Sequence, residues 1–584
     1  MTNTPTSAAR SAPGILGRGG DNALAWLLGL PRATTEYTVE RVKVPMRDGA
    51  LLVADHYAPV TSAPVGTLLL RGPYGRAFPF SWAFARLYAA RGYHVVFQSV
   101  RGTFGSGGDF EPMVNEAADG ADTVEWLRGQ PWFTGRFATV GVSYLGFTQW
   151  AVLRDPPPEL AAAVITAGPH DFNDHSWGSG SFTVGDFLGW CDVVAHQEDP
   201  SRVRLLLRQL QARRKVAEVA GALPLGAAVR EVLGAGAPWF EAWARHDDPN
   251  DAFWDPLRFT EALDRVRVPV LLIGGWQDIF LRQTMQQYAR LRARGVDAAL
   301  TVGPWVHTQL LGKGLPTSAR DTLDWLDTHL GGAEPRRPGR VRVYVTGTAR
   351  GRGWRILPDW PPATTERTLY LRPGGHLGES APTALNGVAP ATFRYDPADP
   401  TPTTGGPLLS PDGGYRDDSG LALRDDVLAF TGLTLAQDLY VYGSPVVELS
   451  HNADGPQADL FVRVSEVSGF GAKGRSRNVS DGYRRVKPVG TSAGTVRIEL
   501  DPIAHRFRAG SRIRVLIAGG CFPRYARNLG TGEPLLTARE SRRTTHAVHY
   551  GPSRLLLPVG SAEPSAERAD PLADRVADPQ GDPV

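Results

Sequence analysis

The pattern of apolar segments changes near residue 339, and this change limits the possible folds more than any other feature of the chain. Before it, short apolar runs typical of buried strands alternate with segments of helical period. Apolar strands that alternate with helices predict a parallel sheet covered by helices on both faces. After it, short alternating strands separated by Gly, Pro and Asp clusters predict an all-β sandwich or jelly roll.

The expected elements follow from these patterns. In the first region we expect strands at residues 37–44, 51–57, 67–71, 94–98, 138–142, 163–166, 268–273 and 298–302, and helices at 116–128, 145–153, 282–291 and 319–330. In the second region we expect strands at 341–346, 368–371, 460–464, 495–500 and 512–517. Helical periods dominate residues 168–264, so this stretch is expected to be a helical cap inserted into the α/β core.

The length of 584 residues favours several domains, because a single hydrophobic core stops growing well below this size. We expect an α/β core at residues 36–167 and 265–335, the cap at 168–264 and a β jelly roll at 338–560. Residues 1–35 are rich in Ser, Thr, Ala, Gly and Arg, and residues 561–584 have few large apolar side chains. These end segments are expected to be flexible and disordered, respectively.

The charge distribution and the cysteine content limit which binding partners and which cellular compartment are expected. The 63 basic and 60 acidic residues are interspersed, which argues against nucleic acid as a partner. Cys191 and Cys521 lie far apart in the sequence, so no disulfide framework is expected and a cytoplasmic location is predicted. No segment approaches 18 uninterrupted apolar residues, so no membrane partner is expected. The basic stretch 202–215 alternates with leucines and is interpreted as a solvated helix face.

No cofactor or metal is expected. The chain has no Walker A motif, HExxH motif or EF-hand loop. Gly469, Gly471 and Gly474 form a GxGxxG pattern after a strand, but the residues that follow open no helix. This pattern is therefore interpreted as a β-loop rather than a dinucleotide site.

A candidate nucleophile lies where the strand expected at 138–142 runs directly into a helix. The sequence there is GVSYLG, with Ser143 at the turn. A serine at a sharp strand-to-helix turn exposes its Oγ, and the helix N-terminus offers N–H groups to a developing oxyanion. The second glycine, Gly146, comes one residue later than in the common GxSxG pattern, and an ordinary Gly-rich turn is the alternative.

Two further strand ends carry the residue types that a serine nucleophile needs. Asp278 follows the strand expected at 268–273, and His307 follows the strand expected at 298–302. α/β-hydrolases place Ser, then Asp or Glu, then His after strands in this chain order. The alternatives are a helix N-cap for Asp278 and a loop histidine bound to a backbone carbonyl for His307. Three strand ends in the required order favour a triad.

The segment RGPYGR follows the strand expected at 67–71, where such folds supply a second oxyanion donor. Tyr74 in this segment has a phenolic O–H that can serve. The alternative is a Pro-Tyr-Gly turn with an exposed ring.

These motifs together resemble one family, the CocE/NonD-type serine hydrolases, which include cocaine esterase, α-amino-acid ester hydrolases and X-Pro dipeptidyl-peptidases. The similar segments span most of residues 37–558. They are VPMRDGALLVADHY, RGPYGR, QSVRGTFGSG, GVSYLG, GGWQD and GPWVH, followed in the second half by residues 458–467, NVSDGYRR and AGSRIRVLIAGGCFPRYAR.

The resemblance implies an α/β-hydrolase core, an inserted helical cap and a C-terminal jelly roll. It also implies that Ser143 is the nucleophile, Asp278 the acid and His307 the base. The oxyanion donors would be the Tyr74 hydroxyl and the Tyr144 backbone N–H. The late glycine is typical of this family, so it no longer counts against the site.

Six residues are candidates for the substrate pocket. Trp177, Phe182, Phe187 and Trp190 in the expected cap are aromatic, with packing inside the cap as their alternative role. His170 and Asp171 follow a core strand and are expected to border the site.

The expected function is hydrolysis of an ester or amide bond of a small acyl compound through an acyl-enzyme. The alternatives are an X-Pro dipeptidyl-peptidase and an acyltransferase that uses an amine acceptor. A non-catalytic carbohydrate-binding protein is also considered, but the intact triad opposes it. The expected partner is a small-molecule substrate, and the sequence is also compatible with a homodimer.

Overall fold

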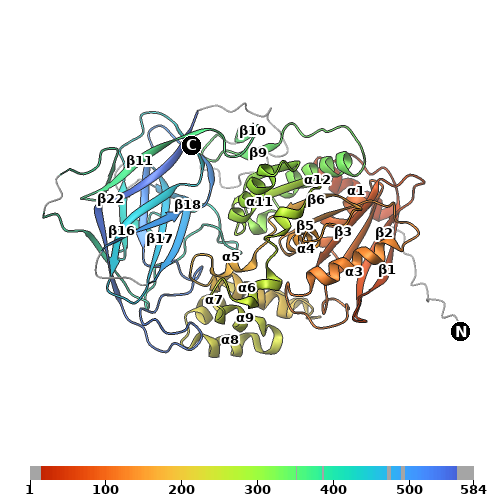
Figure 1. The fold of residues 1–584 in the computed structure, drawn as a ribbon, viewed down its shortest axis with the longest axis horizontal. Helices are drawn as coiled ribbons and strands as arrows, with labels where there is room; N and C mark the ends of the chain where they lie inside the picture. Colours follow the sequence, from red (N-terminus) through yellow and green to blue (C-terminus); the bar gives the residue numbers. More distant parts are fainter. Residues whose placement is uncertain (1–14, 350–351, 384–386, 470–474, 488–492, 562–584) are drawn as a thin grey trace.

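The computed structural model describes residues 15–349, 352–383, 387–469, 475–487 and 493–561. Figure 1 shows one sheet with helices built from the chain up to residue 357, and a region of strands built from residue 364 onward. The helices of an internal insertion lie between and below these two parts in this view. The N-terminal part and the all-β C-terminal part are therefore distinct along the chain and in space.

The first sheet has ten strands in the order β1-β2-β4-β3-β5-β6-β7-β8-β9-β10. Their bounds are β1 (Tyr37–Pro45), β2 (Leu51–Pro59), β3 (Gly66–Gly72), β4 (Tyr93–Ser99), β5 (Phe137–Val142), β6 (Leu160–Thr166), β7 (Val270–Gln277), β8 (Ala298–Val306), β9 (Val341–Tyr344) and β10 (Trp354–Leu357). The sheet is parallel from β4 to β9, whereas the pairs β1–β2, β2–β4 and β9–β10 are antiparallel. The predicted parallel sheet accounts for the strands from β4 to β9, and the antiparallel pairs at both edges were not predicted.

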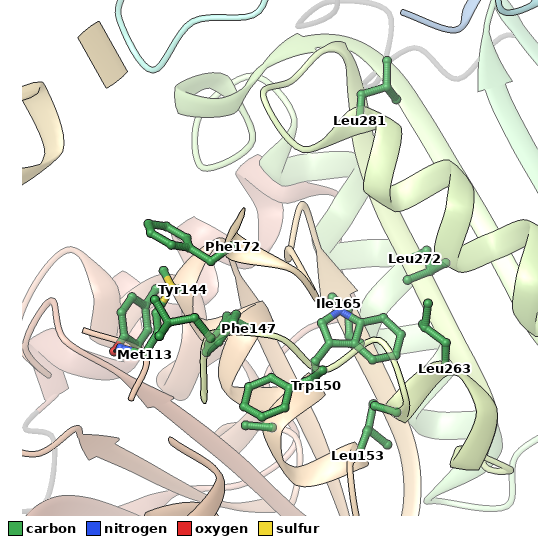
Figure 2. Close-up of a cluster of buried hydrophobic side chains, with 14 of the residues drawn as sticks. Met113, Tyr144, Phe147, Trp150, Leu153, Ile165, Phe172, Leu263, Leu272 and Leu281 are labelled. Carbon is green, nitrogen blue, oxygen red and sulfur yellow. Dashed lines mark hydrogen bonds between the residues drawn. The ribbon is translucent and has the colours of Figure 1, made fainter. Parts of the chain in front are cut away.

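Helices cover both faces of this sheet. They are α1 (Ile15–Leu28), the short α2 (Leu87–Ala89), α3 (Glu116–Arg128), α4 (Tyr144–Leu153), α11 (Leu281–Ala293) and α12 (Leu315–His329). Successive residues of β3 point to opposite faces, so Leu69 belongs to the apolar cluster that includes Trp150 of α4, whereas Leu70 belongs to the cluster that includes Leu323 of α12. Figure 2 shows part of the first cluster, in which Trp150 lies against Ile165 of the sheet.

An insertion follows β6 and ends before β7. It contains α5 (Phe172–Trp177), α6 (Val184–His196), α7 (Arg202–Ala220), α8 (Leu225–Leu233), α9 (Trp239–Arg245) and α10 (Ala262–Arg265). Asp171 caps α5 by accepting hydrogen bonds from the N–H groups of Asn173 and Asp174, at 2.9 and 3.2 Å. The basic stretch expected to be one helix lies in α7, which carries exposed leucines as well as arginines.

The described residues of the C-terminal region form twelve paired strands. They are β11 (Thr364–Arg372), β12 (His376–Gly378), β13 (Ala391–Tyr395), β14 (Val427–Thr431), β15 (Leu439–Gly443), β16 (Val446–Ala453), β17 (Ala458–Ser468), β18 (Arg475–Val486), β19 (Gly494–Glu499), β20 (Ile503–Phe507), β21 (Arg512–Ala518) and β22 (Thr544–Gly560). The main path is β18-β17-β21-β14-β12-β11-β22-β15-β20, with β13 and β16 on β22 and β19 on β16. This region encloses its own apolar core.

The β domain was predicted to begin at residue 338, and the first strand expected in it pairs with the first sheet. The strand expected at 341–346 forms β9, which pairs with β8 and so extends the first sheet. Val341 and Val343 are fully buried in the core of the N-terminal part. Alternation alone does not tell which sheet a short strand joins, since a strand pairs with whichever edge its connection reaches.

The N-terminal segment also differs from the prediction of flexibility through residue 35. Residues 15–28 form α1, whose Asp21 lies 2.9 Å from Arg86 and accepts a hydrogen bond from the Tyr37 hydroxyl. Residues 1–14, the Gly-rich 470–474 and the tail at 562–584 lie outside the described residues. Within the described residues, no helix is long and apolar enough to span a membrane.

Candidate active site

Ser143 lies at the junction of β5 and α4 in a backbone conformation that non-glycine residues rarely adopt. Its φ is 59° and its ψ is −121°. The two glycines of GVSYLG make this turn possible. A Cβ at Gly141 would lie 2.4 Å from that of Leu145, and one at Gly146 would lie 2.5 Å from the Cα of Gly168. The late glycine therefore allows α4 to approach the loop after β6.

Asp278 and His307 follow β7 and β8, which lie side by side in the sheet. His307 Nδ1 is 2.7 Å from Asp278 Oδ2, and their side chains are 7% and 0% exposed. The Phe280 N–H donates a 2.7 Å hydrogen bond to Asp278 Oδ1. Both carboxylate oxygens are thus engaged, which fixes the imidazole with Nδ1 toward the acid and Nε2 on its opposite side.

Tyr74 follows β3, the strand next to β5. Its hydroxyl accepts a 3.1 Å hydrogen bond from Trp190 Nε1, and Tyr74 and Ser143 line the same cavity. Burial raises the pKa of the Tyr74 phenol, more than hydrogen bonding lowers it, so the group remains protonated at neutral pH. The ring stacks on Phe80 and is not the exposed turn residue of the alternative interpretation.

A narrow cavity of about 30 Å³ opens beside Ser143. Its other lining residues are Tyr74, Met113, Tyr144, Pro169, Phe172, His175, Asp186, Phe187, Trp190, Ile279, Phe280 and Leu409. Two of the six predicted pocket residues, Phe187 and Trp190, are therefore at the cavity. Most of the remaining wall is apolar or aromatic.

The other four predicted pocket residues do not line this cavity. His170 is buried against Trp150 and lies 3.1 Å from the Gln287 amide, and burial lowers its pKa to about 4. Besides capping α5, Asp171 forms a 3.0 Å ion pair with Arg258. Trp177 donates to the Trp243 carbonyl, and Phe182 stacks on Phe187. They bind other groups of the protein.

Asp186 of α6 is a site residue that the sequence prediction missed. Its Oδ1 accepts a 2.9 Å hydrogen bond from the Leu409 N–H, but its buried Oδ2 has no hydrogen-bond partner among the described residues. His175 Nε2 is 3.7 Å away, beyond hydrogen-bond range. Burial raises the pKa of Asp186 to about 6 and lowers that of His175 to about 3. The sequence signal was an acidic residue inside the apolar run VGDFLGWC.

A second cavity, of about 120 Å³, shares Asp186, His175 and Ile279 with the first. Its walls come from the insertion, from loops of the first sheet and from the C-terminal strands. They include the carboxylates of Asp174, Asp186, Asp278, Asp481 and Asp501 and the guanidinium groups of Arg282 and Arg524. Because carboxylates outnumber cations, the cavity favours a positively charged or hydrogen-bond-donating group.

Comparisons with known proteins agree with this organisation. The model of the X-Pro dipeptidyl-peptidase (S15) family matches residues 48–309, and that of the X-Pro dipeptidyl-peptidase C-terminal non-catalytic domain matches 334–555. The chain is 31% identical to cocaine esterase from Rhodococcus sp. (strain MB1 Bresler) over 573 residues, which cover 89% of this chain and 98% of that enzyme.

Two solved structures resemble the whole fold. An aminopeptidase from the marine sediment archaeon Thaumarchaeota archaeon is 25% identical, with a TM-score of 0.75 over 91% of this chain and 98% of that one. An α-amino acid ester hydrolase is 24% identical, with the same TM-score and coverage. Both likenesses extend across the N-terminal and the C-terminal parts.

Proposed function

The chain belongs to the S15 family of serine hydrolases, which includes cocaine esterase, and from this premise we propose that Ser143, His307 and Asp278 cleave an ester or amide bond of a small acyl compound. The observation that carries the proposal is the buried 2.7 Å contact between His307 and Asp278, after strands that neighbour the Ser143 turn in the sheet. The chemistry is two-step acyl transfer through an acyl-enzyme.

In the first step, Ser143 Oγ attacks the carbonyl carbon while His307 Nε2 takes the hydroxyl proton. His307 returns this proton to the leaving alcohol or amine, and water activated in the same way then cleaves the acyl-enzyme. Asp278 accepts from Nδ1–H, which holds the imidazole tautomer and stabilises the imidazolium. The carboxylate does not take the proton itself.

The negative charge that develops on the carbonyl oxygen needs donors. The N–H of Tyr144 is at the start of α4, where the first N–H groups of a helix have no partner within it. The Tyr74 hydroxyl is the second donor. Because Trp190 donates to the Tyr74 oxygen, that oxygen already has one partner, and the phenolic O–H remains available to donate to a carbonyl oxygen in the cavity beside Ser143. Two donors of this kind stabilise the transition state more than the substrate.

The apolar wall beside Ser143 supports a small, apolar acyl or alcohol group as the preferred substrate part. Phe172, Phe187, Trp190 and Phe280 supply aromatic surface, and the narrow volume excludes long polymers. Trp190 both lines this wall and holds Tyr74, so substrate packing and oxyanion stabilisation depend on one side chain.

The finer architecture is part of the proposal: an α/β-hydrolase core, a helical cap and a C-terminal jelly roll. The parallel strands β3 to β9, the order Ser143, Asp278, His307 and the insertion between β6 and β7 support it. The core extends through β10, and the jelly roll begins with β11.

A second candidate is hydrolysis or aminolysis of substrates that carry an amino group, including an X-Pro dipeptidyl-peptidase activity. The Oδ2 of Asp186, which has no hydrogen-bond partner in the described part of the chain, favours it, because a buried carboxylate oxygen gains most from an ammonium donor. The arginines of the larger cavity do not compete for it, since Arg282 pairs with Asp501 and Arg524 with Asp481.

One experiment tests the activity and separates the candidates. Wild-type protein and Ser143→Ala are incubated with a fluorophosphonate probe, then assayed on acyl p-nitrophenyl esters and X-Pro anilides, with and without added amine. We expect the probe to label Ser143 of the wild-type protein. We also expect the wild-type protein to cleave short apolar esters faster than X-Pro anilides. Labelling of Ser143→Ala, or its near-normal turnover of an activated ester, contradicts the proposed nucleophile. Faster cleavage of the X-Pro anilides favours the peptidase. Formation of an amide between the acyl group and the added amine favours acyl transfer.

A further inference from the structure

A buried ion pair lies directly behind the proposed oxyanion hole. Arg71, near the end of β3, and Glu116, the first residue of α3, approach to 3.0 Å with side chains only 2% and 4% exposed. Arg71 also donates to the Glu116 carbonyl at 2.9 Å and to Gln98 Oε1 at 2.8 Å. Burial raises the pKa of Glu116, which Arg71 opposes. Buried ion pairs seldom stabilise a core more than apolar residues do, so this one calls for another role.

The pair reaches one oxyanion donor through the Tyr144 side chain. The Tyr144 hydroxyl donates a 2.8 Å hydrogen bond to Glu116 Oε1 and accepts a 2.7 Å hydrogen bond from the Met113 N–H. Figure 2 shows Tyr144 and Met113 side by side. Met113, which lines the cavity beside Ser143, has a left-handed φ of 73°. Glu116 thus holds both the residue that presents the N–H and a residue of the cavity wall.

The same pair reaches the other donor through the backbone of β3. Arg71 is followed by Gly72, Pro73 and Tyr74, and its carbonyl accepts a 3.1 Å hydrogen bond from Thr148 of α4. A Cβ at Gly72 would lie 2.3 Å from Leu145 Cδ1, so β3 and α4 are in close contact there. Displacement of Arg71 would therefore move the segment that carries the Tyr74 hydroxyl.

We propose that Arg71 and Glu116 are positioning residues that set the distance between the Tyr74 hydroxyl and the Tyr144 N–H around Ser143. This inference rests on the proposed function, because it concerns the same oxyanion site. Neither residue is among those that line the cavity beside Ser143, so both act through the tyrosines. The competing explanation is that the pair only supports the core.

Two nearly isosteric variants separate these explanations. Glu116→Gln removes the charge but keeps the shape, and Tyr144→Phe keeps the backbone N–H but removes the link to Glu116. For each we expect kcat per titrated active site to fall about tenfold, with KM changed by less than about twofold. The inhibition constant of an arylboronic acid, whose tetrahedral adduct places an oxygen in the oxyanion hole, should rise by a similar factor. If the two variants act through one network, the double variant loses less than the product of the single effects.

Asp321→Asn is the matched control, because Asp321 of α12 forms a comparably buried ion pair with Arg337 at 2.7 Å, outside both cavities. It should lower Tm but leave kcat per titrated site unchanged. The inference is overturned if Tyr144→Phe, which spares the ion pair, keeps wild-type kcat and boronic acid inhibition, whether or not Glu116→Gln folds. Absence of fluorophosphonate titration in the wild-type protein would instead contradict the proposed function on which the inference depends.

Discussion

Two aspartate–histidine pairs contact the ring of Phe280 through their histidines, and they come from different parts of the molecule. Asp278 and His307 follow strands of the sheet and meet at 2.7 Å. Asp186 and His175 belong to helices of the insertion and remain 3.7 Å apart. The same residue types are thus held in a hydrogen bond by the sheet and held apart by the insertion.

This difference separates two kinds of role. In the sheet pair, both carboxylate oxygens of Asp278 are engaged, by His307 and by the Phe280 N–H, so the acid orients the imidazole. In the insertion pair, one oxygen of Asp186 accepts from Leu409 and the other has no hydrogen-bond partner among the described residues. The first arrangement suits proton transfer, and the second suits the binding of a ligand.

Asp278 and Asp186 are expected to differ greatly in their effect on catalysis. Asp278→Asn should lower kcat on a neutral p-nitrophenyl ester by about 10⁴-fold, because the amide favours the wrong imidazole tautomer. Asp186→Asn should change kcat on the same ester by less than about threefold, since no proton passes through it. Initial rates normalised to titrated active sites measure both. A comparable loss in the two variants would contradict the division of roles.

The next largest effect on kcat is expected from loss of the Tyr74 hydroxyl, the proposed oxyanion donor. Tyr74→Phe removes the phenolic O–H while the ring stays packed against Phe80, and kcat should fall about 10²-fold. Trp190→Phe is the comparison variant, because it keeps the Tyr74 hydroxyl but removes the N–H that donates to it, together with part of the indole surface that lines the cavity. Its effect on kcat should be smaller, with a larger change in KM. A Tyr74→Phe enzyme with wild-type kcat would show that the hydroxyl donates no hydrogen bond in the transition state.

The sheet pair could be predicted from the sequence, whereas the insertion pair could not. Parallel strands bring their carboxyl ends to one edge, so Ser143, Asp278 and His307 were identified as residues that follow apolar runs. No such rule exists for helices that pack at varied angles. Trp177 and Phe182 were predicted to line the pocket because they are aromatic, yet they pack inside the insertion, and Asp186 and Phe172 lie at the cavity instead.

The sequence pattern also did not predict which sheet a short strand joins. The strand at 341–346 has the same alternation as those of the C-terminal region, but β9 completes the first sheet. Likewise, Glu116 is the first residue of the helix predicted at 116–128, a position where a carboxylate suits the helix dipole. Its contact with Arg71, 45 residues away in sequence, arises from tertiary packing that no local pattern encodes.

Substrate selectivity tests whether Asp186 binds a ligand. If Asp186 Oδ2 binds an ammonium group, Asp186→Asn should lower kcat/KM for an amino-acid ester by about tenfold or more relative to its uncharged acyl analogue. The two substrates differ only in the amino group. The ratio of their kcat/KM values within one protein therefore corrects for any general loss of activity in that protein. The selectivity of the wild-type enzyme should also rise with pH through about 6 as the carboxylate ionises. Equal selectivity in wild type and variant would leave Asp186 without a role in binding.

The smallest expected effect is on stability, and its sign follows from the pKa of Asp186. Burial raises this pKa from 3.8 to about 6, so the folded state holds the proton more tightly than the unfolded chain does. Its contribution to stability is therefore fully present below about pH 4 and is lost as the pH rises through about 6.

Asp186→Asn cannot ionise, so its stability relative to wild type should increase between pH 4 and 7 by at most about 2–3 kcal/mol. Thermal unfolding across this pH range measures the difference. A difference that stays constant with pH would mean that Asp186 ionises as readily in the folded protein as in the unfolded chain. Asp186 would then behave as an exposed carboxylate, which contradicts its proposed role as a buried ligand-binding group.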